Sequence, residues 1–286
     1  MARRRRTGFG PVWGTVRIVV GILVVVWSLA PIYWGVVIAF ASAADIRRSP
    51  ASVLPLSIEL GNFDRLLGPG SATQGVFLAA LGSSVIQALG TTLLTLAVAL
   101  PAAYAFARLR FAGSRILLAV ITVTLAVPVY LVLIPLFQLA TATGQINTQQ
   151  GVILVLTSAA LPLAIWILRS HIVTLPADLE AAARLDGAGT FRVLGSIIGP
   201  LVAPGLVAAA VVTFLASWGA FLIPLVYANS SGTEPLTVLI PTFANKFSSD
   251  YGLQSAAGLV AVLPPVLLVV LLQKYLLSGL LKGATK

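Results

Sequence analysis

The chain has 286 residues, of which 58% are hydrophobic and only 9% are charged. Soluble domains carry roughly 25% charged residues, so a chain this apolar needs the lipid bilayer as its solvent. It has no cysteine and one histidine, which excludes disulfides and thiolate metal ligands and leaves too few side chains for a metal cluster.

Stretches that carry no Asp, Glu, Lys or Arg mark the membrane-spanning parts of the chain: 18–44, 66–107, 116–168, 193–233 and 251–273. A helix needs about 20 apolar residues to cross the hydrocarbon core, so the third stretch holds two spans, separated by the polar residues 141–150. We therefore expect an all-α, polytopic membrane protein with about six transmembrane helices in a single domain, residues 1–286. The predicted helices are at about 16–41, 76–108, 116–140, 150–170, 204–227 and 256–277.

Basic residues fall mainly on one side of these spans. If both termini share a side, that side holds 14 of the 18 Lys and Arg residues, including the run Arg3–Arg6. Positive charge is enriched in cytoplasmic loops, so both termini are expected in the cytoplasm. The arginine run is then a topology anchor, and no nucleic-acid partner is expected.

The first and third segments each have a feature that needs interpretation. The apolar run from Ile18 to Phe40 is longer than the signal-peptide core of about 7–15 residues, so we expect it to be retained. The third segment contains Pro128 and Pro135, which free backbone carbonyls. Such prolines occur where a helix lines a cavity or where it packs against neighbours, and both interpretations remain open.

The predicted spans lack the groups that would drive transport or catalysis. Ion-driven transporters keep charged or titratable side chains within the bilayer, and none lies deep in a span here. The sequence also has no glycine-rich phosphate loop, carboxylate pair or nucleophile triad. If the protein moves a solute, another protein must supply the energy.

The cytoplasmic segment 171–203 contains the most informative motif. Pro176 suits the first turn of a helix, and Asp178 and Glu180 follow where carboxylates favour the positive end of the helix dipole. Gly187 can end this helix with a left-handed cap, before a second helix. Two short helices with a small alanine face make a protrusion on which a partner protein can dock.

This segment resembles the cytoplasmic loop of permease subunits of binding-protein-dependent ATP-binding-cassette importers. That motif reads Glu-Ala-Ala, three residues, Gly, nine residues, Ile, one residue, then Leu-Pro. Anchored on the glycine, the chain matches it at Gly187, Ile197 and Pro200, with Gly199 in place of Leu. Ala181 occupies the glutamate position and Glu180 lies one residue earlier, so the sequence leaves open whether Glu180 replaces the missing glutamate.

Three other stretches are similar to the carbohydrate-uptake branch of these importers, in particular to the second maltose permease subunit. Residues 103–111 look like the signature at the end of its second helix. Residues 217–225 are similar to its fifth-helix Trp-x-x-Phe-x-x-Pro-Leu pattern, with Gly219 and Ala220 replacing polar residues that are common there. The tail, 273–286, resembles a C-terminus that contacts the ATPase.

The resemblance implies a type I importer permease fold in a prokaryotic inner membrane. A second homologous permease, two ATPase subunits and an external solute-binding lipoprotein would complete the assembly. ATP and Mg²⁺ would be bound by the ATPases, while this chain would bind no cofactor or metal and would not be an enzyme. The implied ATPase-docking residues are Asp178, Glu180, Ala181, Ala182, Ala183, Arg184, Asp186, Gly187 and Ala188, with C-terminal contacts at Lys282, Gly283 and Lys286.

The implied function is the import of a sugar, either a disaccharide or an oligosaccharide. Candidate pathway residues are Ser83, Ser84, Gln87, Trp218 and Phe221. Small polar residues also mediate helix packing and Trp also lies at the membrane interface, so each has a structural alternative. The competing functions are an importer permease for another solute, such as a glycerol phosphate, and a non-transporting membrane scaffold.

Overall fold

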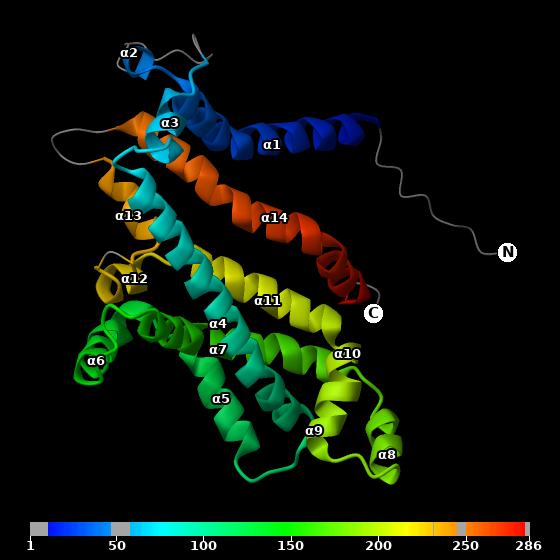
Figure 1. The fold of residues 1–286 in the computed structure, drawn as a ribbon. Coiled ribbons are helices and arrows are strands. Elements are labelled where there is room, and N and C mark those ends of the chain that lie inside the picture. The colour runs from blue at the N-terminus through cyan, green and yellow to red at the C-terminus, as the bar shows by residue number, and fades with distance from the viewer. Residues whose placement is uncertain (1–10, 47–57, 231, 245–249, 284–286) are drawn as a thin grey trace. The chain divides into compact units, whose positions relative to one another are not determined.

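The computed structural model describes residues 11–46, 58–230, 232–244 and 250–283, and every regular element in these ranges is a helix (Figure 1). The all-α prediction is therefore confirmed for the part of the chain that is described. The chain divides into two compact units. The first comprises Met1–Ser71 and Phe243–Val260, and the second Ala72–Thr242 and Ala261–Lys286.

The first unit is built around the end of a long helix. Its helices are α1 (Pro11–Phe40), α2 (Ala43–Ile46), α3 (Gly61–Leu67) and the first residues of α14 (Tyr251–Gly283). The Ser42 hydroxyl accepts a hydrogen bond from the N–H of Asp45 at 3.1 Å and so caps α2. The Asn62 side chain donates to the carbonyls of Ala39 at 3.0 Å and Ala41 at 3.1 Å, which fixes α3 against the end of α1.

An ion pair in the same unit joins Arg65 on α3 to Asp250, just before α14. Burial alone would raise the pKa of the Asp250 carboxyl. Hydrogen bonds from Arg65 and from the N–H of Leu253 outweigh burial and hold that pKa below its ordinary value. Asp250 is therefore charged at neutral pH, and the pair links two segments that are far apart in the sequence.

The second unit packs α4 along α7 and α11. Where these helices meet, many buried residues are alanines, including Ala99, Ala103, Ala164 and Ala209. Small side chains let helices approach closely within a membrane. The helices of this unit are α4 (Gln74–Arg108), α5 (Ser114–Thr124), α6 (Val129–Ala142), α7 (Gln149–Val173), α8 (Asp178–Leu185), α9 (Thr190–Val193), a π-helical turn (Leu194–Ile198), α10 (Gly199–Leu201), α11 (Ala203–Trp218), α12 (Leu222–Tyr227), α13 (Leu236–Thr242) and the rest of α14.

The third predicted span is two helices rather than one. A single helix was expected at 116–140, but α5 ends at Thr124 and α6 begins at Val129. Pro128 between them has an extended backbone, with φ −60° and ψ 132°. A proline offers no N–H to the preceding turn and disfavours helical geometry in the residue before it, which explains the break.

The fifth predicted span, 204–227, is also broken. Its first part, α11, ends at Trp218, and α12 begins at Leu222 after Gly219 and Ala220. On the other side of α11 the chain bends by 81° between Thr190–Leu201 and Ala203–Trp218. Glycine lowers helix propensity, and a proline near the start of α11 favours a new helix over continuation of the preceding one.

Within the described residues, four helices are long and apolar enough to cross a membrane, and the bent pair ending in α11 would make five. The four are α1, α4, α7 and α14, each at a position where a single span is predicted. Both α1 and α14 extend beyond the predicted ranges, because the flanking residues continue the helix past the apolar core. The predicted third segment consists of the short helices α5 and α6.

The helices α7 and α11 approach closely at Gly205. A Cβ atom there would lie 2.7 Å from Cγ of His171, well inside van der Waals contact. The His171 ring is also held by the carbonyl of Ile167, 2.9 Å from its Nδ1. His171 therefore has the structural role that its position at the end of α7 suggests.

Candidate functional site

The predicted docking segment folds into α8 and a glycine turn. The helix has eight residues and begins at Asp178, two residues later than the position of Pro176 suggested. Gly187 has a φ of +78°, as expected for a left-handed cap. The N–H of Ala188 donates to the carbonyl of Ala183 at 2.9 Å, and that of Gly187 to the carbonyl of Arg184 at 3.1 Å. These two bonds form a Schellman motif, which fixes the direction of the chain after α8.

The helix α8 has a buried face and an exposed face. Glu180 and Ala183 are buried, three residues apart and therefore on the same side of the helix. Asp178, Ala181, Ala182, Arg184, Asp186 and Gly187 are exposed, and Ala188 is partly buried against the core of the unit. The alanine surface predicted from the sequence is thus accessible to a partner, whereas the Glu180 side chain is not.

The Glu180 carboxylate lies in a cluster of polar side chains from α4 and α8. Its Oε1 forms an ion pair with Nε of Arg108 at 2.6 Å. Its Oε2 accepts a hydrogen bond from the Tyr104 hydroxyl at 3.0 Å. Arg184 in turn donates to that hydroxyl at 3.2 Å. We call Tyr104, Arg108, Glu180 and Arg184 the α4–α8 cluster; it compensates the negative charge of a buried carboxylate.

Arg108 also holds the end of α7. Its Nη2 donates to the carbonyl of Ile172 at 3.1 Å and to that of Leu175 at 2.6 Å. Lysine and arginine side chains near a helix C-terminus satisfy carbonyls that have no partner within the helix. One guanidinium therefore joins the last turn of α4, the end of α7 and the first turn of α8.

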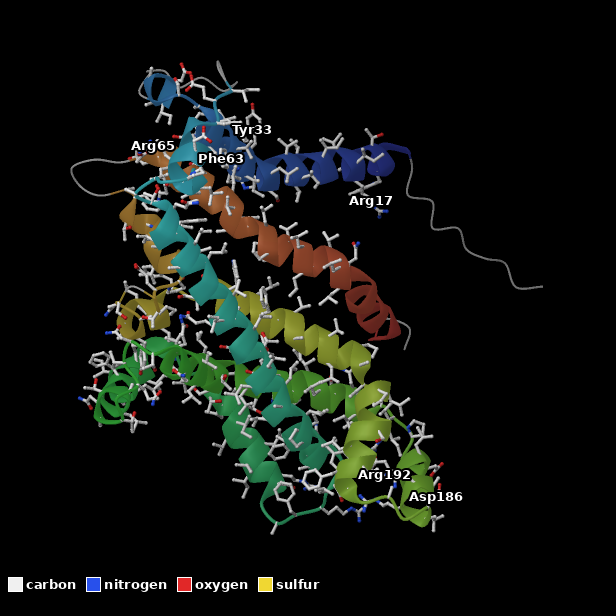
Figure 2. The ribbon with its side chains drawn as sticks, viewed as in Figure 1. Arg17, Tyr33, Phe63, Arg65, Asp186 and Arg192 are labelled. Atoms are coloured by element: carbon white, nitrogen blue, oxygen red, sulfur yellow. The ribbon has the colours of Figure 1, made fainter. Side chains whose placement is uncertain are left out.

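The exposed end of this protrusion carries two large apolar side chains. Leu185 at the end of α8 is 89% exposed, and Phe191 in α9 is 88% exposed. Figure 2 shows Asp186 and Arg192 at the same end of the second unit. Exposed apolar side chains beside charged ones are typical of protein–protein contact sites. The sequence prediction missed Leu185 and Phe191. Both lie outside the predicted spans, where lipid does not account for an apolar side chain, and this position is a signal that could have identified them.

The candidate pathway residues Ser83, Ser84 and Gln87 are all buried on α4. Their polar groups contact Gly232, Thr233 and Leu236 in the segment 229–236, which follows α12 and of which residue 231 lies outside the described residues. Gln87 also donates to the side chain of Gln149 at 3.0 Å. These side chains therefore hold the loop against α4, and their role in a solute pathway stays a prediction.

The two aromatic candidates lie at the end of α11. Trp218 stacks on Phe214, with 5.6 Å between ring centroids, and its indole N–H donates to the carbonyl of Ala261 at 3.2 Å. Phe221 is 45% exposed. Neither lines the nearby open cavity of about 260 Å³, whose lining comes mainly from α7 and α11.

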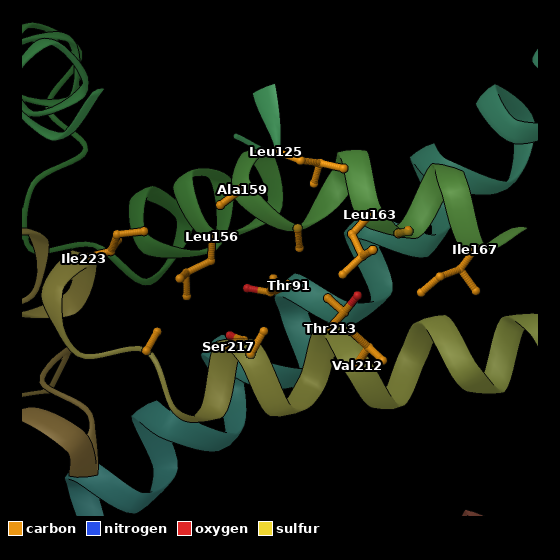
Figure 3. Close-up of a pocket in the computed structure, with 14 residues that line it drawn as sticks. Thr91, Leu125, Leu156, Ala159, Leu163, Ile167, Val212, Thr213, Ser217 and Ile223 are labelled. Carbon is orange, nitrogen blue, oxygen red and sulfur yellow. The ribbon is translucent and has the colours of Figure 1, made fainter. Parts of the chain in front are cut away.

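That cavity is mostly apolar, with a few hydroxyl groups (Figure 3). Its polar side chains are Thr91, Thr213 and Ser217. The hydroxyl of Thr91 is buried without a hydrogen-bond partner in the described structure, and that of Ser217 donates to the carbonyl of Gln87 at 3.4 Å. Because no lining residue is charged, the cavity suits a neutral molecule better than an ion.

The predicted C-terminal contacts lie at the end of α14. Lys282 and Gly283 belong to its last turn, whereas Lys286 lies outside the described residues. Their contact with an ATPase stays a prediction.

These helices and the protrusion formed by α8 and α9 define a multi-pass helical membrane protein. Comparison with known proteins identifies the family. Residues 96–282 match the family described as the binding-protein-dependent transport system inner membrane component, and the chain belongs to that family. It is therefore a transport subunit with the type I importer permease fold.

Individual relatives cover almost the whole chain. The trehalose/maltose transport system permease protein MalG of Thermococcus litoralis is 32% identical, over 94% of this chain and 95% of that protein. The trehalose transport system permease protein SugB of Mycobacterium tuberculosis is 31% identical, over 92% and 94%. Among solved structures, a chain of a bacterial ABC transporter involved in the import of the acidic polysaccharide alginate matches with a TM-score of 0.80. It is 20% identical, over 93% of this chain and 96% of that chain, and so supports the fold alone.

Proposed function

We propose that this chain is the membrane-spanning permease subunit of an ATP-driven importer that carries a disaccharide or oligosaccharide into a prokaryotic cell. The observation that carries the proposal is the protrusion of α8 and α9, whose exposed alanines, Leu185 and Phe191 are available to a separate ATPase. Family membership supports the requirement for an ATPase, a partner permease and a binding protein.

The complete assembly would contain one further homologous permease, two ATPase subunits and an external solute-binding lipoprotein in the inner membrane. ATP and Mg²⁺ would bind to the ATPases, and this chain would hold no cofactor. The docking contacts would come from the exposed residues of the α8–Gly187 segment. Lys282, Gly283 and Lys286 would add a second contact at the C-terminus.

A sugar is the favoured solute for two reasons. The relatives named for trehalose and maltose transport cover nearly the whole chain. No residue that lines the cavity between α4, α7 and α11 is Lys or Arg, whereas an anionic solute such as a glycerol phosphate would call for basic residues.

The test is to purify the assembly from its native membrane in mild detergent, identify its subunits by mass spectrometry, and reconstitute it in proteoliposomes. We expect an ATPase, a second permease and a binding protein to accompany the chain, and ATP hydrolysis to rise when the loaded binding protein is added. If the ATPase is absent, or if no solute stimulates hydrolysis, a non-transporting scaffold becomes the better account. Stimulation by a glycerol phosphate and not by sugars would contradict the proposed solute class.

A further inference from the structure

The helix α4 makes polar contacts at two places along its length with segments that are distant in the sequence. It has 35 residues without interruption, and Pro101 lies inside it. One set of contacts, the α4–α8 cluster, involves Tyr104 and Arg108 in its last two turns. The other set involves Ser83, Ser84 and Gln87, more than four turns earlier. All of these residues belong to the second unit.

The α4–α8 cluster orients α8 through the helix side that faces away from a partner. Tyr104 is 2% exposed and Glu180 7% exposed, so neither side chain is accessible for docking. Their contacts join residues 76 positions apart in the chain. Because Arg108 also binds carbonyls at the end of α7, α8 cannot tilt without breaking contacts of a buried charge.

The other cluster joins α4 to the segment 229–236. The Ser83 hydroxyl donates to the carbonyl of Gly232 at 3.0 Å, and Gln87 donates to that of Thr233 at 2.7 Å. The N–H of Leu236 donates to the Ser84 hydroxyl at 2.8 Å.

Gln149 on α7 completes this second cluster. Its Nε2 donates to the Ser83 hydroxyl at 3.0 Å and to the carbonyl of Gly232 at 2.9 Å. Gly232 has a φ of +100°, a backbone conformation that residues with a side chain rarely adopt. The glycine therefore allows the chain to take the path on which its carbonyl meets Ser83 and Gln149.

We infer that Tyr104, Arg108 and Glu180 are positioning residues of the transport cycle, and that α4 passes a displacement of α8 on to the segment 229–236. Because α4 is continuous between its two sets of contacts, a shift imposed on α8 reaches the segment 229–236 through it. Glu180 then serves to fix α8 on α4 and does not replace the motif glutamate as a contact for the ATPase. The inference rests on the proposed function, because an ATPase must supply the displacement.

The first test uses the reconstituted full assembly and two variants that change few atoms. Glu180→Gln removes the charge and keeps the shape, and Tyr104→Phe removes one hydroxyl. We expect both variants to retain the ATPase and to hydrolyse ATP, while solute uptake per ATP falls by at least about fivefold. The control is Ser170→Ala, which loses two local contacts of an exposed hydroxyl near the same end of α7, with the carbonyl of Ile167 and with Nδ1 of His171.

The second test measures the response of the segment 229–236 directly. Because the chain has no cysteine, Asn229→Cys supplies one exposed site for a spin label on the segment 229–236. We expect an ATP-dependent change in the label's mobility, which either Glu180→Gln or Gln87→Leu abolishes when added to that background.

Three outcomes would overturn the inference. Variants that couple hydrolysis to uptake like the unmodified assembly would show that the α4–α8 cluster is dispensable. Variants that lose the ATPase would assign Glu180 and Tyr104 to docking. A label response that persists in both variants would show that α4 does not carry the displacement. In each case the unmodified assembly still imports solute with ATP, whereas its failure to do so would contradict the proposed function itself.

Discussion

At the scale of single residues, Glu180 has a position that the sequence could predict only in part. The helical period places Glu180 and Ala183 on one side of α8 and the neighbouring Ala181 and Ala182 elsewhere. Which side faces the protein depends on Tyr104 and Arg108, which lie more than 70 residues earlier. One sequence gives no signal for such a pairing, so the docking segment was predicted but the burial of its glutamate was not.

Gly187 is the residue whose substitution tests the turn after α8. Its φ of +78° would cost a side-chain-bearing residue roughly 1–2 kcal/mol, and nothing lies within 4 Å of the added Cβ. We therefore expect Gly187→Val to alter the turn without a steric clash and to reduce uptake more than hydrolysis, measured in proteoliposomes. Gly195→Ala, also without close neighbours and with an ordinary φ, is the matched control. Normal uptake by Gly187→Val at wild-type expression would refute a role for this turn in docking.

Glu234 provides a prediction about pH. Burial raises the pKa of its carboxyl above the ordinary value of 4.5, so the folded protein binds this proton more tightly than the unfolded chain does. The free energy of unfolding then falls as pH rises from 4.5 through the raised pKa, because burial opposes the ionisation of Glu234 in the folded state. We expect Glu234→Gln to raise the thermal unfolding temperature at neutral pH and to reduce its pH dependence. An unfolding temperature that drops at neutral pH would show that the carboxylate has a stabilising partner.

At the scale of elements, the apolar pattern locates the helices but not their interruptions. The uncharged stretches predicted α4, α7 and α14, because an apolar run in a membrane has few alternatives to helix. The breaks at Pro128 and after Trp218 were missed. Prolines within membrane helices are tolerated in some places, as Pro101 is inside α4, so a proline alone does not predict a break.

The packing of α7 against α11 gives a prediction at the same scale. Gly205→Ala would place a Cβ 2.7 Å from the His171 ring, so either the ring must leave its contact with the carbonyl of Ile167 or one of the two helices must shift. We expect a lower unfolding temperature in detergent, at a cost of about 1–3 kcal/mol. Gly82→Ala on α4 has nothing within 4 Å and should be neutral or stabilising, because alanine is the better helix former. Equal effects of the two substitutions would contradict the close approach at Gly205.

At the scale of the whole molecule, charge and hydropathy predicted the class of protein, and the loop motif predicted the family. Both properties follow from local composition and spacing, which one sequence contains. The two polar networks along α4 could not be predicted, because they join segments brought together only by the packing of α4, α7 and α11. Ser83, Ser84 and Gln87 were recognised as significant polar residues within a span, but their contacts with the segment 229–236 required the structure.

The central claim is that the protrusion of α8 and α9 docks a separate ATPase, and proximity labelling tests it most directly. The chain has no cysteine, so Leu185→Cys introduces one reactive site at a position that is 89% exposed. A photoreactive crosslinker attached there would be activated in native membranes, with Val120→Cys on the exposed surface of α5 as the matched control. We predict a crosslinked product with an ATP-binding-cassette ATPase from Leu185→Cys and none from Val120→Cys. Crosslinking at Leu185→Cys to lipid alone, or to no ATPase in an assembly that still hydrolyses ATP, would contradict the docking site.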